Sequence, residues 1–136
     1  MRVALLSSEV VPFAKTGGLA DVAGALPKFL RTCDVDTNII LPLYSKTDRA
    51  LLDEQLLENL HLEWRGRKVS VPVHCSSAAG VPAYLIESDY FLRPSIYGYP
   101  DDHERFAFFS RASLSLLKQI GWQPDVVHGN DWLCTV

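Results

Sequence analysis

The apolar positions near the N-terminus follow first a strand pattern and then a helical one. Residues 2–7 contain a continuous apolar run that ends at polar residues, which predicts a strand buried on both faces of a parallel sheet. After the Gly17–Gly18 pair, apolar side chains recur at helical spacing on one stripe: Leu19, Val22, Ala23, Leu26, Phe29 and Leu30. Pro27 either kinks this helix or lies in the first turn of a second segment that begins near Gly24, and the pattern leaves both open.

The middle of the chain alternates between short strand patterns and turns. A strand is expected at 38–41, ended by Pro42, and a short helix at 51–60. Residues 62–65 and 68–71 flank Gly66 with period-two alternation, which predicts a β-hairpin. One further strand is expected at 83–86.

The C-terminal third contains an aromatic loop, the clearest helix and one more strand. Residues 89–102 show no clean period, so we expect an ordered loop that its tyrosines and phenylalanine hold in place. The helix runs from about 104 to 120, with Asp101 or Asp102 as its cap and a stripe at helical spacing: Phe106, Phe109, Ser113, Leu116, Leu117 and Ile120. A short buried strand at 125–128 follows, and Asn130 or Asp131 offers the N-cap of another helix.

The order of these elements predicts an α/β fold, an incomplete Rossmann-like doubly wound domain. Four parallel strands are expected, at 2–7, 38–41, 83–86 and 125–128, whereas a complete sheet of this kind commonly has about six. The last strand lacks a covering helix. We therefore expect exposed apolar surface and an open sheet edge there, unless a partner or a missing segment covers them.

Composition narrows the class of protein. The 136 residues are 48% hydrophobic and 21% charged, with a net charge of −3, as in one ordinary globular domain. The acidic balance argues against a nucleic-acid or membrane-surface binder, and no apolar stretch has the roughly 18 residues that a spanning helix needs. The N-terminal apolar run is too short for a signal peptide, and three widely spaced cysteines fit neither a disulfide framework nor a zinc site, so we expect a cytoplasmic protein.

A glycine pair between the first strand and the first helix is a candidate anion site. Gly17 and Gly18 put backbone N–H groups at the positive end of a helix dipole, and Lys15 adds a positive charge beside them. A phosphate is stabilised in such a place. By itself the signal is weak, because it matches no full phosphate-loop fingerprint and any strand-to-helix turn can use glycine.

Three blocks in the right order give the turn a more specific meaning. The first spans 8–28, the second 97–109 and the third 124–132. Together they closely resemble the corresponding blocks of bacterial glycogen synthases and plant starch synthases. The resemblance extends from one end of the chain to the other.

The resemblance implies a retaining glucosyltransferase that transfers glucose from ADP-glucose to the non-reducing end of an α-1,4-glucan, with no metal and no further cofactor. Family members have the GT-B architecture of two Rossmann-like domains facing across a cleft, and residues 1–136 are similar to the first part of the N-terminal domain. An arginine, a lysine and an essential acidic residue come from the C-terminal domain. We therefore expect that domain to be absent from this chain and the chain alone to be inactive.

The same resemblance assigns roles to individual residues. Lys15 is implied to bind the nucleotide-sugar, with the backbone of Gly17 and Gly18 close to its phosphates. Asp21 is either a polar contact of the substrate or a charge that stabilises the first helical turn. Asp101 matches an acidic position that lines the active site, although the two carboxylates at 101–102 are also sufficient as a helix cap.

Asn130 stands where many family members have a histidine that faces the donor glucose. Asparagine can donate and accept hydrogen bonds with a sugar hydroxyl but cannot carry a proton charge. Asn130 and Asp101 are thus the candidate catalytic residues of this chain, and no metal ligand is expected. His128 is more simply a strand residue than a functional one.

Three other interpretations remain. The chain can be a non-catalytic module that binds a nucleotide-sugar or a glucan, or a fragment with no independent role. A nicotinamide-dependent oxidoreductase is a distant competitor, because the sheet is shared but the glycine fingerprint and the ribose-binding acid are not convincingly in place.

Overall fold

The computed structural model describes residues 1–131 and 134. Its elements are, in chain order, β1 (Arg2–Leu6), α1 (Gly18–Thr32), β2 (Asp36–Pro42), the 3-10 helix η1 (Arg49–Leu51), β3 (Leu60–Trp64), β4 (Arg67–Val71), β5 (Val73–Ser76), β6 (Ala83–Ile86), α2 (Asp102–Gln119) and β7 (Val126–Gly129).

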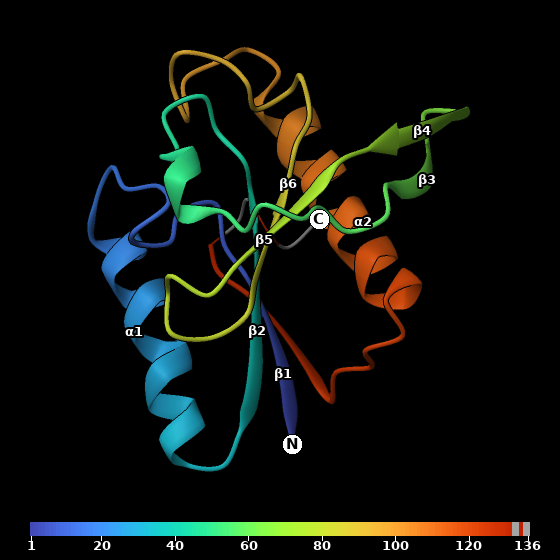
Figure 1. Cartoon of the computed structure of the whole chain (residues 1–136). Helices are drawn as coiled ribbons and strands as arrows, with labels where there is room; N and C mark the ends of the chain where they lie inside the picture. The colour runs from blue at the N-terminus through green and yellow to red at the C-terminus, as the bar shows by residue number, and fades with distance from the viewer. Residues whose placement is uncertain (132–133, 135–136) are drawn as a thin grey trace.

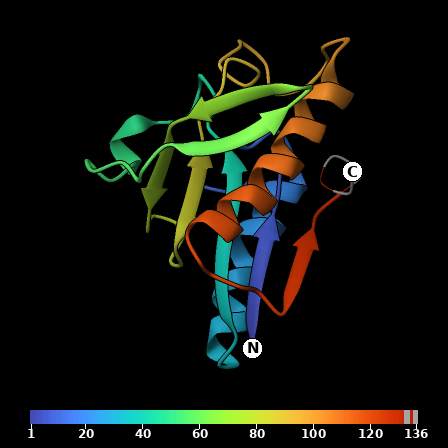
Figure 2. The same cartoon turned by 90° about the vertical axis from the view of Figure 1, so that its right-hand side faces the viewer.

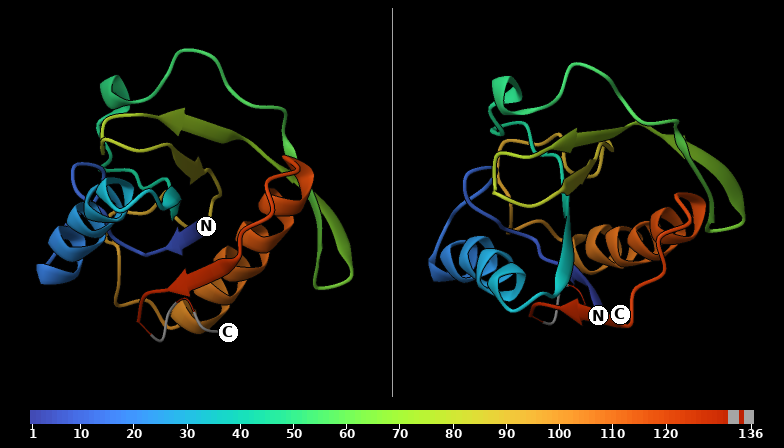
Figure 3. Two further views of the ribbon diagram at one scale, coloured as in Figure 1. Left: turned by 90° about the horizontal axis from the view of Figure 1, so that it is seen from below. Right: turned by 60° about the horizontal axis from the view of Figure 1, so that its bottom comes forward.

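A five-stranded sheet forms the centre of the molecule, in the order β5-β6-β2-β1-β7. The strands β6, β2, β1 and β7 pair in parallel, and β5 pairs antiparallel with β6. Figures 1 and 2 show α1 on one face of the sheet and α2 on the other, and the view from below in Figure 3 shows the same three layers. The expected α/β class and the four parallel strands are confirmed.

The sheet divides the core into two apolar clusters. On β1, Ala4 and Leu6 belong to the cluster under α2, while Leu5 belongs to the cluster that includes Ala23 of α1. Successive side chains of a strand point to opposite faces, so a strand covered on both sides is apolar throughout. The continuous apolar run of β1 has this cause.

The hairpin β3–β4 is confirmed, and the geometry of its turn explains it. Trp64 pairs with Arg67, and the two residues between them, Arg65 and Gly66, both have positive φ angles, 53° and 76°. Two left-handed residues define a type I′ turn, whose twist matches that of the strands. The hairpin lies against α2. The Trp64 indole nitrogen also donates a hydrogen bond to the hydroxyl of Tyr90, which lies in the loop before α2.

The prediction of a helix at 51–60 is wrong, and the strand β5 was not predicted. Only η1 forms there. The following chain runs beside β5, with the Asp53 amide donating to Cys75 O (2.8 Å) and the Leu57 amide donating to Val73 O (3.2 Å). These long-range hydrogen bonds override the helical spacing of the leucines, which is a local preference only.

The first helix is continuous through Pro27, so this proline does not open a second segment. Its buried face differs from the expected stripe, because Ala20, Ala23, Gly24 and Pro27 are buried whereas Val22 and Phe29 are 57% and 64% exposed. Small residues bring the helix close to the chain before it. A Cβ on Gly24 would lie only 2.5 Å from a methyl group of Val11.

The strand β7 lies at the edge of the sheet, next to β1. Val126 and Val127 are each 44% exposed, so the prediction of a buried strand is wrong while the expected exposed apolar surface is confirmed. The described residues cover the two valines only in part, although Val127 lines a pocket with Leu117 and Trp122. The helix expected after Asn130 falls partly on residues 132, 133, 135 and 136, which lie outside the described part.

Candidate functional site

The loops that follow β1, β2 and β7 meet at one edge of the sheet. Leu6, the last residue of β1, pairs with Ile40 of β2 on one side and with Gly129 of β7 on the other. The Asn130 amide donates to Leu6 O (2.9 Å), directly beyond β7. Open α/β sheets bind their ligands at this carboxyl edge, so the loop after β1 and Asn130 lie where the fold places a site.

The glycine turn is held by Glu9. The Oε1 atom of Glu9 accepts hydrogen bonds from the backbone amides of Thr16 and Gly17, the latter at 3.2 Å. The Thr16 hydroxyl donates to Oε2 (2.8 Å). The expected set of free N–H groups is therefore corrected: Glu9 already occupies the amide of Gly17, and the Gly18 amide has no hydrogen-bond partner among residues 1–131 and 134.

The protein itself does not require glycine at 17 or 18. Gly17 has an extended backbone (φ −161°), which any residue adopts, and a Cβ built on Gly17 or Gly18 would meet no described atom within 4 Å. The space above the turn is open. A pair of glycines there keeps that space clear for something other than the protein.

Lys15 and Asp21 form an ion pair across the start of α1. The Lys15 ammonium lies 2.9 and 2.8 Å from the two carboxylate oxygens, and both side chains are more than half exposed. A pair so exposed contributes about 0–1 kcal/mol, so a more highly charged anion can compete for the lysine. Asp21 also lies in the first helical turn, where a negative charge is favourable.

A cavity of about 470 Å³ opens beside this turn, and Lys15 and Thr16 line it. Its walls also include Tyr44, Lys46 and Thr47, which follow β2, Ser95, Ile96 and Tyr97 from the aromatic loop, and residues 12–14, which precede Lys15. We call it the turn pocket. Lys46 makes no ion pair among the described residues. Sequence reasoning missed Lys46, although its position directly beyond the carboxyl end of a parallel strand was a signal for it.

Tyr97 connects the aromatic loop to the turn. Its hydroxyl donates to Glu9 Oε2 (2.6 Å) and accepts from the Ser8 hydroxyl (2.7 Å). Burial raises the pKa of Glu9, but the hydrogen bonds from Tyr97, Thr16 and Gly17 outweigh it and leave the pKa below its usual value of 4.5. Burial, together with donation to Glu9, raises the pKa of Tyr97, so the phenol stays protonated.

Asp101 does not line the turn pocket. Its carboxylate forms a two-pronged pair with Arg93 (2.8 and 3.0 Å), and the hydrogen bonds from Arg93 lower the pKa of Asp101. Asp101 is the N-cap residue of α2 by position, but its side chain makes no capping hydrogen bond. The Asp102 carboxylate instead accepts hydrogen bonds from the backbone amides of Gly98 and Tyr99.

Asn130 lies at the correct edge of the sheet but is not among the residues that line the turn pocket. Its Nδ2 atom is buried and has no hydrogen-bond partner in the described part of the chain. Its proposed role toward a sugar stays a prediction. His128 is exposed on β7.

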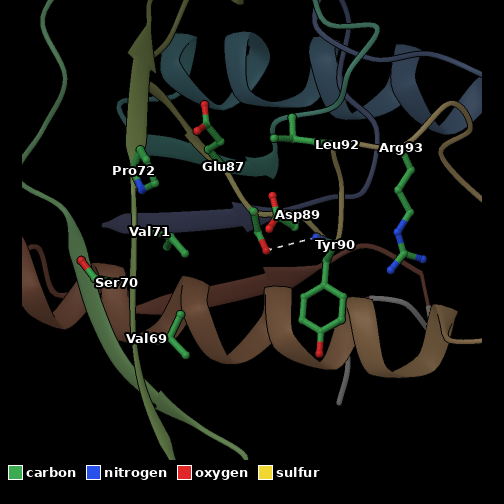
Figure 4. A pocket seen from close by; sticks show the side chains of 10 residues that line it. Val69, Ser70, Val71, Pro72, Glu87, Asp89, Tyr90, Leu92 and Arg93 are labelled. Carbon is green, nitrogen blue, oxygen red and sulfur yellow. Dashed lines mark hydrogen bonds between the residues drawn. The ribbon is translucent and has the colours of Figure 1, made fainter.

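A second pocket of about 460 Å³ lies between β4 and the chain after β6. Figure 4 shows Glu87 and Asp89 on its wall, with the Tyr90 ring directed toward α2 and Arg93 directed away from the strands. None of the residues predicted from the sequence lines it. The Glu87 carboxylate is already engaged by His74 (3.0 Å) and Arg49 (3.2 Å).

No group of three or more histidine, cysteine, aspartate or glutamate side chains comes together among the described residues in a way that could hold a metal ion. Neither described helix has the length and apolarity needed to cross a bilayer.

The mainly parallel sheet with one helix on each face defines a doubly wound α/β domain of the Rossmann-like type. Comparison with known proteins identifies the family: the description "Starch synthase catalytic domain" matches residues 2–136, so the chain belongs to that family. The match confirms the resemblance of the three sequence blocks.

Relatives and a solved structure agree with this assignment. Glycogen synthases of Clostridium beijerinckii and Geotalea uraniireducens are 44% and 43% identical to the chain, each over 97% of it. The catalytic domain of starch synthase IV from Arabidopsis thaliana, bound to ADP and acarbose, is 33% identical with a TM-score of 0.90 over 97% of the chain. The chain spans only 28–29% of the length of these three proteins, in their N-terminal part.

Proposed function

We propose that this chain supplies the N-terminal, donor-facing wall of a glycogen or starch synthase, which transfers glucose from ADP-glucose to the non-reducing end of an α-1,4-glucan. One observation carries the proposal: the fold does not require its two glycines, and they directly follow Lys15 and Thr16, which line the turn pocket. An ADP diphosphate fits this chemistry, because an amide at a helix N-terminus and a lysine both stabilise negative charge.

In this proposal the residues of the turn have separate tasks. The free Gly18 amide donates a hydrogen bond to a phosphate oxygen. Lys15 breaks its ion pair with Asp21 and binds the same diphosphate. Lys46, which also lines the turn pocket, adds a second positive charge there. Asp21 releases the lysine without leaving a buried charge unpaired, because both side chains are exposed.

Asn130 and Asp101 keep their proposed roles at the sugar end. Asn130 can hydrogen-bond a glucose hydroxyl from the carboxyl edge of β7 once its side chain turns outward, because its Nδ2 atom is buried and lacks an acceptor among the described residues. Asp101 can reach a substrate only after it separates from Arg93. Asp101 is therefore the weaker of the two assignments.

The diphosphate-binding arginine and lysine and the essential acidic residue of the family belong to a C-terminal domain, which we propose is separate from these 136 residues. The chain alone then binds the donor weakly and transfers no glucose. Further polypeptide, or a partner, covers the open edge at β7, where Val126 and Val127 are exposed. We also propose a cytoplasmic location, in keeping with the three free cysteines.

A calorimetric titration with ADP-glucose tests the proposal. Lys15→Ala should bind about 5-fold more weakly than the wild-type chain, since one exposed charge contact is lost. Lys118→Ala, which removes an exposed lysine from the last turn of α2, is the matched control and should bind as the wild type does. Equal heats for all three proteins would argue against the diphosphate site.

An incubation of the purified chain with ADP-glucose and a glucan tests its inactivity. Elongation by the chain alone would contradict the need for a second domain. The alternative function is a non-catalytic binding module. This alternative is favoured only if the chain, once joined to the remaining polypeptide, still binds ADP-glucose but transfers no glucose.

A further inference from the structure

One buried carboxylate lies between two segments that are far apart in the sequence. Glu9 follows β1 and is 4% exposed, yet it makes no ion pair among the described residues. Its charge is instead stabilised by four hydrogen bonds, two from backbone amides and two from hydroxyl groups. Such a group is stable only while all of its partners stay in place.

The two amides belong to the glycine turn and determine which of its donors remain free. The Glu9 carboxylate takes the amides of Thr16 and Gly17 and leaves that of Gly18. It thereby fixes the two peptide groups that directly precede the Gly18 amide, the donor on which the proposed diphosphate site depends. A change in the position of Glu9 must move those peptide groups, because carboxylate hydrogen bonds to N–H groups are short and directional.

The hydroxyl on the other side of Glu9 comes from the aromatic loop. Tyr97 reaches the carboxylate across 88 positions of sequence. Arg105, which is fully buried in α2, holds this loop by donating to the carbonyl oxygens of Tyr90 and Ile96, the second of which directly precedes Tyr97. The guanidinium also lies 4.7 Å from the centre of the Tyr99 ring.

We propose that Glu9 is a positioning residue that couples the aromatic loop, through Tyr97, to the glycine turn, so that the position of the loop controls the readiness of the turn to bind a diphosphate. The proposal rests on the proposed function for the identity of the ligand. The coupling itself rests only on the contacts of Glu9. It makes the loop at 89–102 part of the donor site although most of its residues lie outside the turn pocket.

Amide hydrogen exchange tests the coupling without any ligand. Tyr97→Phe removes one hydroxyl and keeps the ring, so the fold is retained. We expect the amides of Thr16 and Gly17 to exchange at least about 10-fold faster in this variant. Tyr99→Phe is the matched control, because its hydroxyl accepts a hydrogen bond from Ser95 in the same loop but does not touch Glu9. Unchanged exchange at both amides in Tyr97→Phe would overturn the proposal.

Titration with ADP tests the consequence for binding. Glu9→Gln and Tyr97→Phe should each weaken ADP binding about 10-fold, and the double variant should bind no more weakly than the weaker single one, because both changes break one path. Tighter binding by Glu9→Gln would mean that Glu9 acts only by charge repulsion. Unchanged affinity with a lowered melting temperature would mean a purely structural role, and either result overturns the proposal.

The two experiments separate two kinds of failure. If the wild-type chain binds no ADP while the Thr16 and Gly17 amides still respond to Tyr97→Phe, the coupling stands and the proposed function fails. If ADP binds and the amides do not respond, the proposed function stands and the coupling fails.

Discussion

Replacement of Arg105 by methionine should strongly destabilise the protein, although methionine fills a similar volume. The Arg105 guanidinium is fully buried and donates to Tyr90 O at 2.7 Å, Ile96 O at 3.1 Å and Asp102 Oδ1 at 2.6 Å. The variant Arg105→Met leaves the buried carbonyl oxygen of Ile96, the partly buried carbonyl oxygen of Tyr90 and the Asp102 carboxylate without this donor.

The size of the effect follows from these contacts. Each hydrogen bond to a charged group contributes about 1.5–3 kcal/mol, so the two carbonyl bonds alone amount to about 3–6 kcal/mol. The Arg105 Nη2 atom is buried and has no partner among the described residues, which offsets about 1 kcal/mol or more of that sum. The Asp102 carboxylate still accepts hydrogen bonds from the amides of Gly98 and Tyr99, so its loss of Arg105 adds little to the change in stability. We expect a net loss of about 2–5 kcal/mol.

Urea denaturation followed by circular dichroism measures this loss. Arg111→Met is the matched control, because Arg111 is exposed on the same helix and should change stability by less than about 0.5 kcal/mol. A loss below about 1 kcal/mol for Arg105→Met would refute the reasoning, since the aromatic loop would then be held without the guanidinium.

Three further predictions concern the first helix, the acid stability and the open edge. Gly24→Ala should lower the free energy of unfolding by about 1–3 kcal/mol, because its Cβ would lie 2.5 Å from a methyl group of Val11. A Cβ at Gly18 meets no described atom within 4 Å, so Gly18→Ala is the control and should fold normally. Equal melting temperatures of the two variants would contradict this prediction. The folded-state pKa of Glu9 lies below its usual value of 4.5, so its contribution is complete above that pH and is lost as the pH falls through the folded-state pKa. Glu9→Gln should therefore flatten the acid limb of a stability-against-pH curve, and an unchanged limb would show that Glu9 is not linked to folding. Val127→Lys should change the melting temperature little, because its side chain is 44% exposed; a large drop would mean that the described residues already cover this edge.

The elements that sequence predicted best are those with a strong local signal. The hairpin followed from a two-residue turn ending in Gly66, and α2 followed from a stripe that is buried against the hairpin and the sheet. The helix at 51–60 failed because hydrogen bonds from Asp53 and Leu57 to the edge of β5 are long-range, and no local pattern contains them. Tertiary contacts of this kind override local spacing.

The site shows the same division. Lys15 and Gly18 follow from a motif within a few residues; Lys15 lines the turn pocket, and Gly18 begins α1 after the loop that leaves the carboxyl end of β1. The bond between Glu9 and Tyr97 joins two segments 88 positions apart, so neither the occupied amide of Gly17 nor the role of the aromatic loop could be deduced without the fold. The pairing of Asp101 with Arg93 could not be deduced either, because the sequence pattern indicated a helix cap at this position.

The central claim is that the turn pocket, not the pocket of Figure 4, is the nucleotide-sugar site. A titration of the isotope-labelled chain with ADP, followed by amide nuclear magnetic resonance, tests it most directly. The account predicts the largest shift changes at residues 15–18, with smaller ones at 44–47 and 95–97. Changes concentrated at residues 69–71 and 87–93, with the turn unaffected, would contradict it.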